Sequence, residues 1–327
     1  MPTNLPPEYY EVEKRYKEAQ TTEEKIELLE ELISTIPKHK GTDHLRADLR
    51  RRLSKLKAST QSQKKTSTAV SVYLIDKEGA GQIAVVGPAN SGKSALVANT
   101  TNANPEVAEY PFTTWQPTPG MMQIENIQVQ LIDTPPLDKE FVEPELFQLI
   151  RRADLILLMV DLLADPIEQL KHSIQVLIEN RIIPLHLKDQ YPEGGNKYIP
   201  LLVLCNKNDD QATDENYHIF CELMEEEWPC IPFSVNTGRN LEAVKKAIFE
   251  KLDIIRIYSK APGDEPDFTS PFVAKKGSTV ADFARKIHKD FYDNLKSARV
   301  WGSGDFDGQM VSRDHVLLDE DVVELKI

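Results

Sequence analysis

The sequence has few cysteines and no pattern that would join them. Cys205, Cys221 and Cys230 are the three cysteines of the 327-residue chain, and their spacing fits neither a disulfide framework nor a zinc motif. Cys205 lies in an apolar run typical of a core strand. A reducing cytosol is therefore the simplest expectation.

Long hydrophobic runs are also lacking. No apolar stretch approaches the ~20 residues that a membrane-spanning helix needs. The N-terminal stretch MPTNLPPEYYEVEK has no signal-peptide pattern. These absences predict a soluble, cytoplasmic protein with no membrane partner.

Positive charge is scarce outside one segment. The formal net charge of −13 argues against a protein that binds nucleic acid over its whole surface. Residues 38–65 nevertheless carry ten Lys or Arg against Asp43 and Asp48, a local charge of +8. This segment predicts a basic contact surface, with a solvated helix face as the alternative.

The pattern of residues 8–58 is that of a helical hairpin. Thr21 and Glu24 fit a capping box at the start of one helix, Pro37 ends it, and Thr42 opens the next. No aromatic residues interleave the basic positions, so contact with RNA there would be to the phosphate backbone. The polar stretch 58–68 is a predicted linker.

Strand-like and helical runs alternate from about residue 81 to 257. This alternation predicts an α/β domain with a mostly parallel sheet, helices on both faces and ligands beyond the strand C-termini. The expected strands are 82–86, 121–124, 127–132, 154–161, 200–205 and 230–234, with an extra strand over 70–75. The expected helices lie near 92–102, 141–152, 166–180, 215–226 and 239–256.

The remaining segments are expected to connect or follow this domain. An inserted loop is expected at 184–199 and a second linker at 261–267. A small C-terminal module with short strands and a helix near 279–290 ends the chain. The expected division is an N-terminal basic helical region over 1–66, a nucleotide-binding domain over 67–262 and the C-terminal module over 268–327.

The stretch GPANSGKS, Gly87 to Ser94, fits the phosphate-loop pattern G-x-x-x-x-G-K-[ST] between a predicted strand and a predicted helix. Backbone N–H groups at such a loop and at the helix N-terminus attract anionic oxygens. Lys93 would reach the β- and γ-phosphates, and the Ser94 hydroxyl would ligate Mg²⁺. The residues expected to bind the phosphates are Gly87, Pro88, Ala89, Asn90, Ser91, Gly92, Lys93, Ser94 and Ala95.

Three further stretches follow later strands. LIDTPP places Asp133 at a strand end, where a carboxylate can hold Mg²⁺ through water. LLVLCNKND supplies Asp209, which can accept two hydrogen bonds from guanine that adenine cannot donate. IPFSVNTG follows the last strand and suits contact with the base edge. The predicted base-binding residues are Asn206, Lys207, Asp209, Ser234, Val235 and Asn236.

The stretch VGPANSGKSALVANTTNANPEVAEYPFTTWQPTPG resembles the Obg family of translation-factor-related GTPases, and most closely its developmentally regulated GTP-binding (DRG) branch. The tail, GSTVADFARKIHKDFYDNLKSARVWG with LLDEDVVELKI, resembles the TGS domain, a ubiquitin-like β-grasp module that DRG proteins carry at this end. The glycine-rich N-terminal domain of Obg proteins is missing, which favours the DRG side. The resemblance covers about residues 80–327.

This resemblance implies a fold, cofactors and a metal ligand. The fold is a P-loop GTPase domain of the Obg type followed by a TGS domain, and the cofactors are GTP or GDP with Mg²⁺. Pro105 to Thr114 corresponds to switch I. The family pattern makes Thr114 the threonine whose hydroxyl ligates Mg²⁺ when GTP is bound.

Departures from the family pattern bear on catalysis. The family writes D-x-P-G at switch II, whereas this chain has Pro136 in place of the glycine and so loses an N–H that senses the γ-phosphate. Leu137 stands where Ras-like enzymes have a water-orienting Gln. A K⁺ ion held by Asn90 is a hypothesis for how hydrolysis is supported. The expected catalytic residues are thus Lys93, Thr114 and Asn90.

Two functions from different classes fit these residues. The first is a slow GTPase that acts with ribosomes or structured RNA through the basic hairpin and the TGS domain, with an activating protein as a candidate partner. The second is a nucleotide-dependent scaffold that binds GTP or GDP and scarcely hydrolyses it, which Pro136 favours. An ATP-using phosphotransferase is weakened by Asp209.

Overall fold

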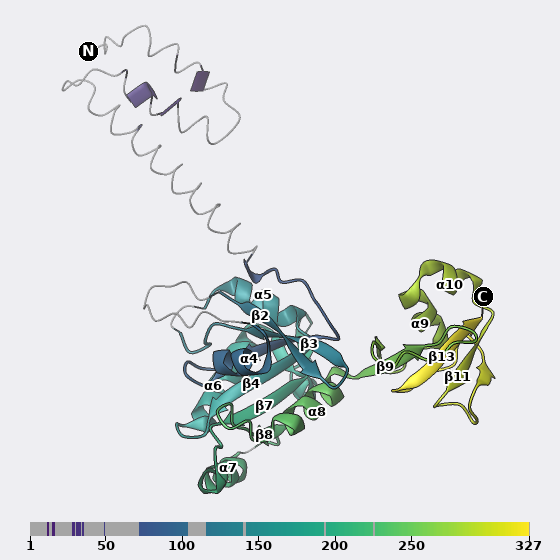
Figure 1. Ribbon diagram of the computed structural model, residues 1–327. Helices are drawn as coiled ribbons and strands as arrows, with labels where there is room; N and C mark the ends of the chain where they lie inside the picture. The colour runs from purple at the N-terminus through teal and green to yellow at the C-terminus, as the bar shows by residue number, and fades with distance from the viewer. Residues whose placement is uncertain are drawn as a thin grey trace, which may run out of the picture. The chain divides into compact units, whose positions relative to one another are not determined.

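The computed structural model describes residues 72–103, 116–139, 142–192, 194–224 and 226–326, with scattered residues between 12 and 49. They fall in two compact units, Met1–Val72 and Tyr73–Ile327. In the first unit the described residues are helical (Figure 1), and their apolar cluster comprises Val12, Leu28, Leu29, Leu32 and Leu49. The capping box at Thr21, the basic positions of 38–65 and the linker 58–68 lie outside the described residues.

A six-stranded sheet forms the centre of the second unit. Its strand order is β2-β3-β1-β4-β7-β8. The β2–β3 pair is antiparallel and the other pairs are parallel. The strands are β1 (Gln82–Val86), β2 (Thr118–Ile124), β3 (Ile127–Asp133), β4 (Leu155–Asp161), β7 (Leu201–Asn206) and β8 (Cys230–Pro232).

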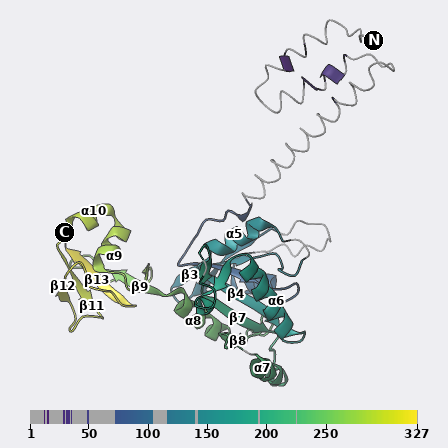
Figure 2. The ribbon, with the colours of Figure 1, turned by 180° about the vertical axis from the view of Figure 1, so that it is seen from behind.

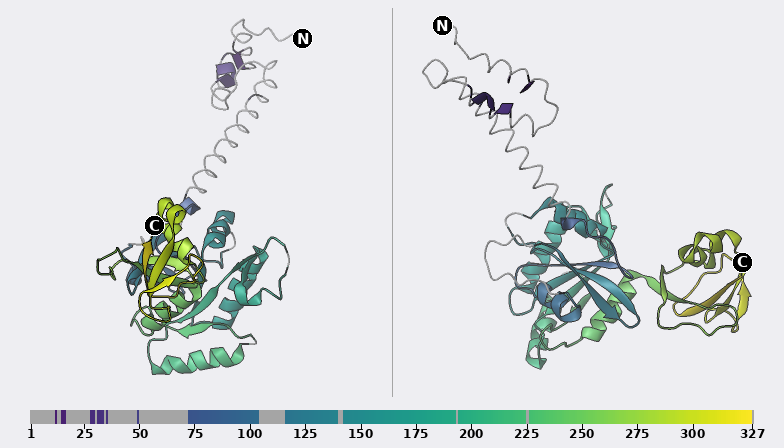
Figure 3. Two further views of the ribbon diagram at one scale, coloured as in Figure 1. Left: turned by 90° about the vertical axis from the view of Figure 1, so that its right-hand side faces the viewer. Right: turned by 45° about the horizontal axis from the view of Figure 1, so that its top comes forward.

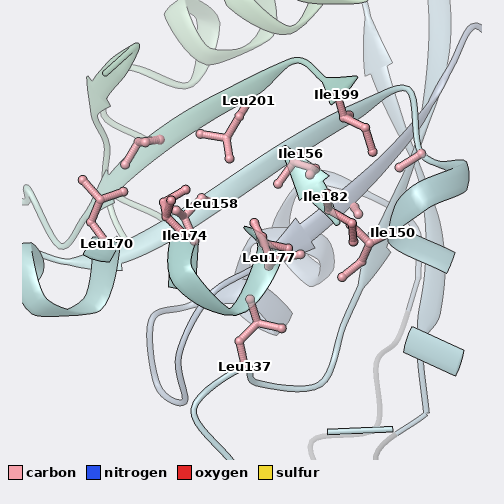
Figure 4. Packing of buried hydrophobic residues seen from close by; sticks show 14 of the residues in the cluster. Leu137, Ile150, Ile156, Leu158, Leu170, Ile174, Leu177, Ile182, Ile199 and Leu201 are labelled. Atoms are coloured by element: carbon pink, nitrogen blue, oxygen red, sulfur yellow. The ribbon is translucent and has the colours of Figure 1, made fainter. Parts of the chain in front are cut away.

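Helices cover both faces of this sheet (Figures 1 and 3), as the alternation of elements predicts. On one face pack α5 (Pro144–Arg152), α6 (Pro166–Glu179) and Phe220 of α7 (Gln211–Leu223). Figure 4 shows this cluster from close by. On the other face pack α4 (Lys93–Thr100) and α8 (Leu241–Leu252). Successive strand residues point to opposite faces, so both faces of the central strands are apolar.

The C-terminal module has its own sheet of five strands in the order β10-β9-β13-β11-β12. Its strands are β9 (Ile254–Ser259), β10 (Phe272–Lys275), β11 (Ser297–Trp301), β12 (Gln309–Val311) and β13 (Asp321–Lys326). Helices α9 (Val280–Ile287) and α10 (Lys289–Asn294) lie on one face of it (Figure 2). Phe283 and Ala284 of α9 join Ile257 and Val300 in the core of this module.

The structure corrects four expectations for the polypeptide between residues 70 and 267. The described part of the segment 70–75 is not a strand, because Val72 and Tyr73 are helical and residues 74 and 75 are irregular. The predicted helix 239–256 stops at Leu252, where Asp253 adopts φ 52 and β9 begins. The predicted linker 261–267 connects β9 to β10 within one sheet. The predicted loop 184–199 begins at the end of β5 (Ile182–Pro184), contains the turn η1 (Leu185–Leu187) and ends in β6 (Lys197–Ile199), which pairs with β5 in parallel.

Arg256 of β9 joins the two sheets. Its buried guanidinium pairs with Glu125 in the β2–β3 turn and with Asp319, at 2.7 Å, in the C-terminal module. Asn126 of the same turn donates to the Tyr258 hydroxyl at 2.7 Å. The turn of the β2–β3 hairpin is therefore fixed against the second sheet.

Two expectations from composition can be compared with the structure. The three cysteines are free thiols, and Cys205 is buried in β7 as its apolar context predicts. Across the described ranges, no helix combines the length and the apolarity that crossing a bilayer requires.

Candidate functional site

The loop between β1 and α4 has a shape that depends on its two glycines. Gly87 has φ 145, and a Cβ there would lie 2.4 Å from the carbonyl oxygen of Met159. Gly92 has φ 101, and a Cβ there would lie 2.2 Å from Nδ2 of Asn206. Side chains at either position would clash with atoms of β4 or β7, so the pattern's two glycines are required by the packing.

Lys93 is buried at the start of α4. Its Nζ donates to the carbonyl oxygens of Gly87, at 3.1 Å, and Pro88, at 2.6 Å. Burial lowers the pKa of Lys93 to about 8, against the opposing charges of Asp133 and Asp138. The loop thus holds a poorly hydrated ammonium group, which is suited to bind the oxygens of a phosphate chain.

Backbone N–H groups at the start of α4 have no side-chain cap. Gly92 is the N-cap residue, and the first turn contains no acidic side chain. The first N–H groups of a helix lack intrahelical partners and carry the positive end of the helix dipole. Ala89, Asn90 and Ala95 are exposed around this point, and Asn90 adopts φ 60. These features form an anion-binding loop.

Asp133 ends β3 beside the loop. Its pKa is raised because the carboxyl group is buried, while a hydrogen bond with Ser94 and the charge of Lys93 act in the opposite direction. Within the described ranges its Oδ1 is buried without a hydrogen-bond partner. An orphaned carboxylate oxygen beside a serine hydroxyl fits a hard cation such as Mg²⁺, which prefers oxygen ligands. Thr114, the third predicted metal ligand, lies outside the described residues.

The residues that follow Asp133 are held on the loop. The Thr134 hydroxyl donates to the carbonyl of Val85 at 2.7 Å, and the Leu137 N–H donates to the carbonyl of Gly87 at 3.1 Å. Pro135 and Pro136 are buried, and Leu137 is 1% exposed. The N–H that follows Pro136 is therefore committed to the protein's own backbone.

The predicted base-binding residues lie at the ends of β7 and β8. Asn206 is buried and connects three segments: its Nδ2 donates to the carbonyl of Ser91 at 2.9 Å, and its Oδ1 accepts from the N–H of Val235 at 3.1 Å. Ser234 donates its hydroxyl to the carboxylate of Asp209. Asp209 is exposed, so its carboxylate is accessible to a ligand. Asn236 is exposed in the same loop.

Several residues that sequence reasoning missed complete this end of the site. Asp161 ends β4 and pairs with Nζ of Lys207, which adopts φ 68. Arg239 donates to Oδ1 of Asn208 at 2.7 Å and pairs with Asp214. The apolar run LILLMVD ends in an aspartate, as the run IQVQLID ends in Asp133, and this signal could have identified Asp161.

The described members of the predicted site thus lie at one end of the sheet, beyond the C-termini of its parallel strands. The phosphate loop follows β1, Asp133 ends β3, and the base-binding residues follow β7 and β8. Parallel α/β sheets bind ligands at this end, beyond the carboxyl ends of the strands. Asp138 also contacts the loop, since its Oδ1 accepts from the N–H of Ala89 at 3.0 Å, and the sequence analysis did not select it.

Known families and proteins match both described domains. Residues 82–189 match the family described as 50S ribosome-binding GTPase, and residues 255–327 match the TGS domain. A GTP-binding protein of Methanocaldococcus jannaschii is 31% identical over 93% of this chain and 93% of its own length. Ribosome-interacting GTPase 1 of Saccharomyces cerevisiae is 24% identical over 93% of this chain and 99% of its own.

A solved structure shares the fold. The YchF GTPase of Schizosaccharomyces pombe has a TM-score of 0.53 at 12% identity and is matched over 77% of this chain and 99% of its own. The full-length match to the archaeal protein and the two domain matches, taken with the loop geometry, decide the family. The chain belongs to the Obg-like family of GTP-binding proteins, in which a P-loop GTPase domain is followed by a TGS domain.

Proposed function

We propose that this protein binds GTP and GDP, hydrolyses GTP slowly to GDP and phosphate, and acts with ribosomes or structured RNA. The observation that carries the proposal is the Asn206 side chain. It bonds the phosphate loop at Ser91 and the base-binding loop at Val235, so one buried amide holds both halves of a nucleotide site in register.

The phosphate half would bind the nucleotide through Lys93 and the N–H groups of Gly87 and of Ala89 to Ala95; Pro88 has no N–H to donate. Ser94 and Asp133 have the chemistry to hold Mg²⁺, with Thr114 as a third ligand. A bound Mg²⁺ would neutralise negative charge on the phosphate oxygens. The orphaned Oδ1 of Asp133 supports this assignment, because a buried carboxylate oxygen without a partner is costly unless a ligand satisfies it.

The base half would select guanine. The Asp209 carboxylate is accessible, and Ser234 orients it by a hydrogen bond. Lys207 pairs with Asp161, and its aliphatic stem would lie beside the base. Val235 and Asn236 complete the loop that would contact the base edge. Since adenine cannot donate the matching pair of hydrogen bonds, GTP is preferred over ATP.

Hydrolysis would depend on positioning and electrostatics rather than on a covalent step. Leu137 is buried, so this position cannot orient a water molecule. Asn90 is exposed at φ 60 in the loop, which suits it to hold a K⁺ ion. The alternative function is a scaffold that binds nucleotide with little turnover, which Pro136 favours because it has no N–H to offer the γ-phosphate.

The expected partner is a ribosome or structured RNA, reached through the basic hairpin and the TGS domain. A relative named for its interaction with ribosomes and a family model described as ribosome-binding support this, and both favour action in the cytoplasm. An activating protein is a second candidate partner. Within the family we place the chain nearest the DRG branch on its Pro105–Thr114 stretch; the likeness to YchF at 12% identity is one of fold.

GTP turnover measured in K⁺ and in Na⁺, with and without ribosomes, tests this function. We expect slow turnover that is faster in K⁺ and with ribosomes, and no turnover in a Lys93→Ala variant. Binding without turnover in every condition would instead support the scaffold. Equal rates in K⁺ and Na⁺ would exclude the Asn90 role.

The ribosome contact has a separate test. Pelleting with ribosomes at two salt concentrations should show weaker binding at the higher salt if basic residues meet phosphates. Binding that does not change with salt would exclude a phosphate contact by the basic hairpin.

A further inference from the structure

The segment after β3 places a carboxylate on the phosphate loop. We propose that Asp138 determines the preference between the diphosphate and the triphosphate: its side chain occupies a loop N–H needed by the terminal phosphate, so the site favours GDP until that carboxylate is displaced. This inference rests on the proposed function and adds a specificity-determining residue to it.

The first observation is the contact itself. Oδ1 of Asp138 accepts from the N–H of Ala89 at 3.0 Å, and Ala89 is the third residue of the loop. A carboxylate on a loop N–H is chemically equivalent to a phosphate oxygen, since both are anionic acceptors. Asp138 is also close enough to Lys93 to raise the pKa of that lysine against the effect of burial. The Asp138 carboxylate therefore acts on two of the loop's phosphate-binding groups.

The second observation is that the backbone before Asp138 is anchored. Leu137 is 1% exposed and is part of the hydrophobic cluster in Figure 4, and its N–H donates to the carbonyl of Gly87 at 3.1 Å. The carboxylate is thus placed by the fold and is not a group at the tip of a free loop. Asp138 itself is exposed, so its side chain can rotate away while Leu137 stays in place.

The third observation is that the backbone of Pro136 and Leu137 offers no N–H to a terminal phosphate. Pro136 has no N–H, and the N–H of Leu137 is already used. A terminal phosphate would therefore meet the Asp138 carboxylate, with the buried Asp133 carboxyl nearby, opposite the ammonium of Lys93 and the charge of Lys139 that acts on Lys93. Two like charges a few ångströms apart repel each other even at the effective dielectric constant of a protein surface. GDP lacks the terminal group and avoids most of this repulsion.

The test compares Asp138→Asn with the parent protein. The Asn side chain keeps an oxygen that can accept from Ala89 and removes only the charge. Dissociation constants would be measured for GDP and for a non-hydrolysable GTP analogue in Mg²⁺, with the full chain. We expect the ratio of the two constants to move toward the triphosphate by about tenfold, and GDP affinity to change by less than about twofold.

Two control variants distinguish an effect of the Asp138 charge on the ratio of the two dissociation constants from a general effect of removing a surface charge. Asp189→Asn removes an exposed acid of the connection after η1 and should leave the ratio unchanged. Asp138→Ala should shift the ratio in the same direction as Asp138→Asn, because both remove the charge. A lowered melting temperature with an unchanged ratio in both Asp138 variants would show a structural cap and overturn the inference.

The remaining outcomes distinguish the inference from the function on which it rests. Weaker triphosphate binding in Asp138→Asn would overturn the inference, since Asp138 would then support that state. If the parent protein binds neither nucleotide, the proposed function itself fails. If it binds both and the Asp138 variants keep the parent ratio, only the inference fails.

Discussion

The two ends of the proposed nucleotide site, the base end and the phosphate end, are built differently. At the base end, the polar side chains have partners: Asn206 bonds to backbone atoms of Ser91 and Val235, Lys207 pairs with Asp161, and Ser234 donates to Asp209. At the phosphate end, by contrast, charged groups are buried without enough partners to offset their lost hydration. Lys93 is buried with a lowered pKa, and Asp133 has a buried oxygen without a partner among the described residues.

We infer from this difference that the base end recognises the nucleotide, whereas the phosphate end changes when the nucleotide binds. A preformed network binds its ligand without reorganising, so the base end can select a nucleotide in either state. Buried charge without full compensation is costly, and that cost falls when a ligand of opposite charge arrives. The phosphate end is therefore where binding alters the protein most, and variants at the two ends should differ in kind.

The largest expected effect comes from removing the charge at the phosphate end. Lys93→Ala should weaken GTP and GDP binding about a thousandfold, or ~4 kcal/mol, because charge-assisted bonds to phosphate oxygens are lost. The melting temperature of the nucleotide-free protein should not fall, since the variant no longer buries an ammonium group. Titration calorimetry and thermal melts measure the two effects. GTP affinity equal to that of the parent would refute the phosphate-loop assignment.

The pH dependence of stability gives a second test of the same end. Below pH 8 Lys93 is protonated in both states, and the folded state bears the cost of burying its charge. Between about pH 8 and its ordinary pKa of 10.5, the unfolded chain keeps this proton and the folded protein does not, so this residue makes stability rise with pH. Lys93→Met should be more stable than the parent at pH 7, by a margin that shrinks by about 3 kcal/mol toward pH 10. Denaturant unfolding at four pH values checks this; a constant margin would contradict it.

We expect the hydrogen bonds through which Asn206 connects the two ends to contribute to the stability of the fold. Asn206→Ala leaves the Ser91 carbonyl and the Val235 N–H without their partner, which should lower the free energy of unfolding by about 2 kcal/mol. Asn236→Ala changes an exposed amide of the same loop and should have almost no effect. Chemical denaturation compares the two variants. Equal stabilities would show that the Asn206 bonds do not connect the ends.

The smallest expected effect tests base recognition alone. Asp209→Asn replaces one acceptor oxygen by an amide and should reduce the preference for GTP over ATP by about tenfold, or ~1.4 kcal/mol. Ser234→Ala keeps the carboxylate and removes only its orienting bond, so it should reduce the preference less. Competition of GTP and ATP for one labelled nucleotide measures both. An unchanged ratio in Asp209→Asn would remove Asp209 from the base site.

Local patterns explain why much of the fold was predictable. The glycine spacing of the phosphate loop and the apolar runs of β1, β4 and β7 are encoded over a few residues each, and each predicted strand of the central sheet is present within a few residues of its expected bounds. The start of α7 was expected at 215 but lies at Gln211, because Asp210 and Thr213 form a capping box. That signal is visible in the sequence.

Contacts between distant segments explain what was missed. The apolar residues of α8 run on into Ile254 and Ile255, so periodicity alone extends the helix, but these two side chains lie in different cores on either side of a strand. Nothing in the sequence marks Asp138, and its position on the loop follows from the contacts of Leu137 with Gly87 and of Asp138 with Ala89. Such placements depend on tertiary packing, which a pattern of neighbouring residues does not predict.

The β2–β3 hairpin connects Asp133, the proposed Mg²⁺ ligand, to the second sheet. Its register runs unbroken from Thr118 opposite Asp133 to Ile124 opposite Ile127, a span of roughly 20 Å. The turn beyond it is bound to Arg256 and Tyr258 of the second sheet. A slip of β3 by one residue would turn the Asp133 side chain to the other face and break both turn contacts together. An insertion at the turn would therefore be expected to displace Asp133, the proposed Mg²⁺ ligand, and the turn's contacts with the second sheet oppose such a shift.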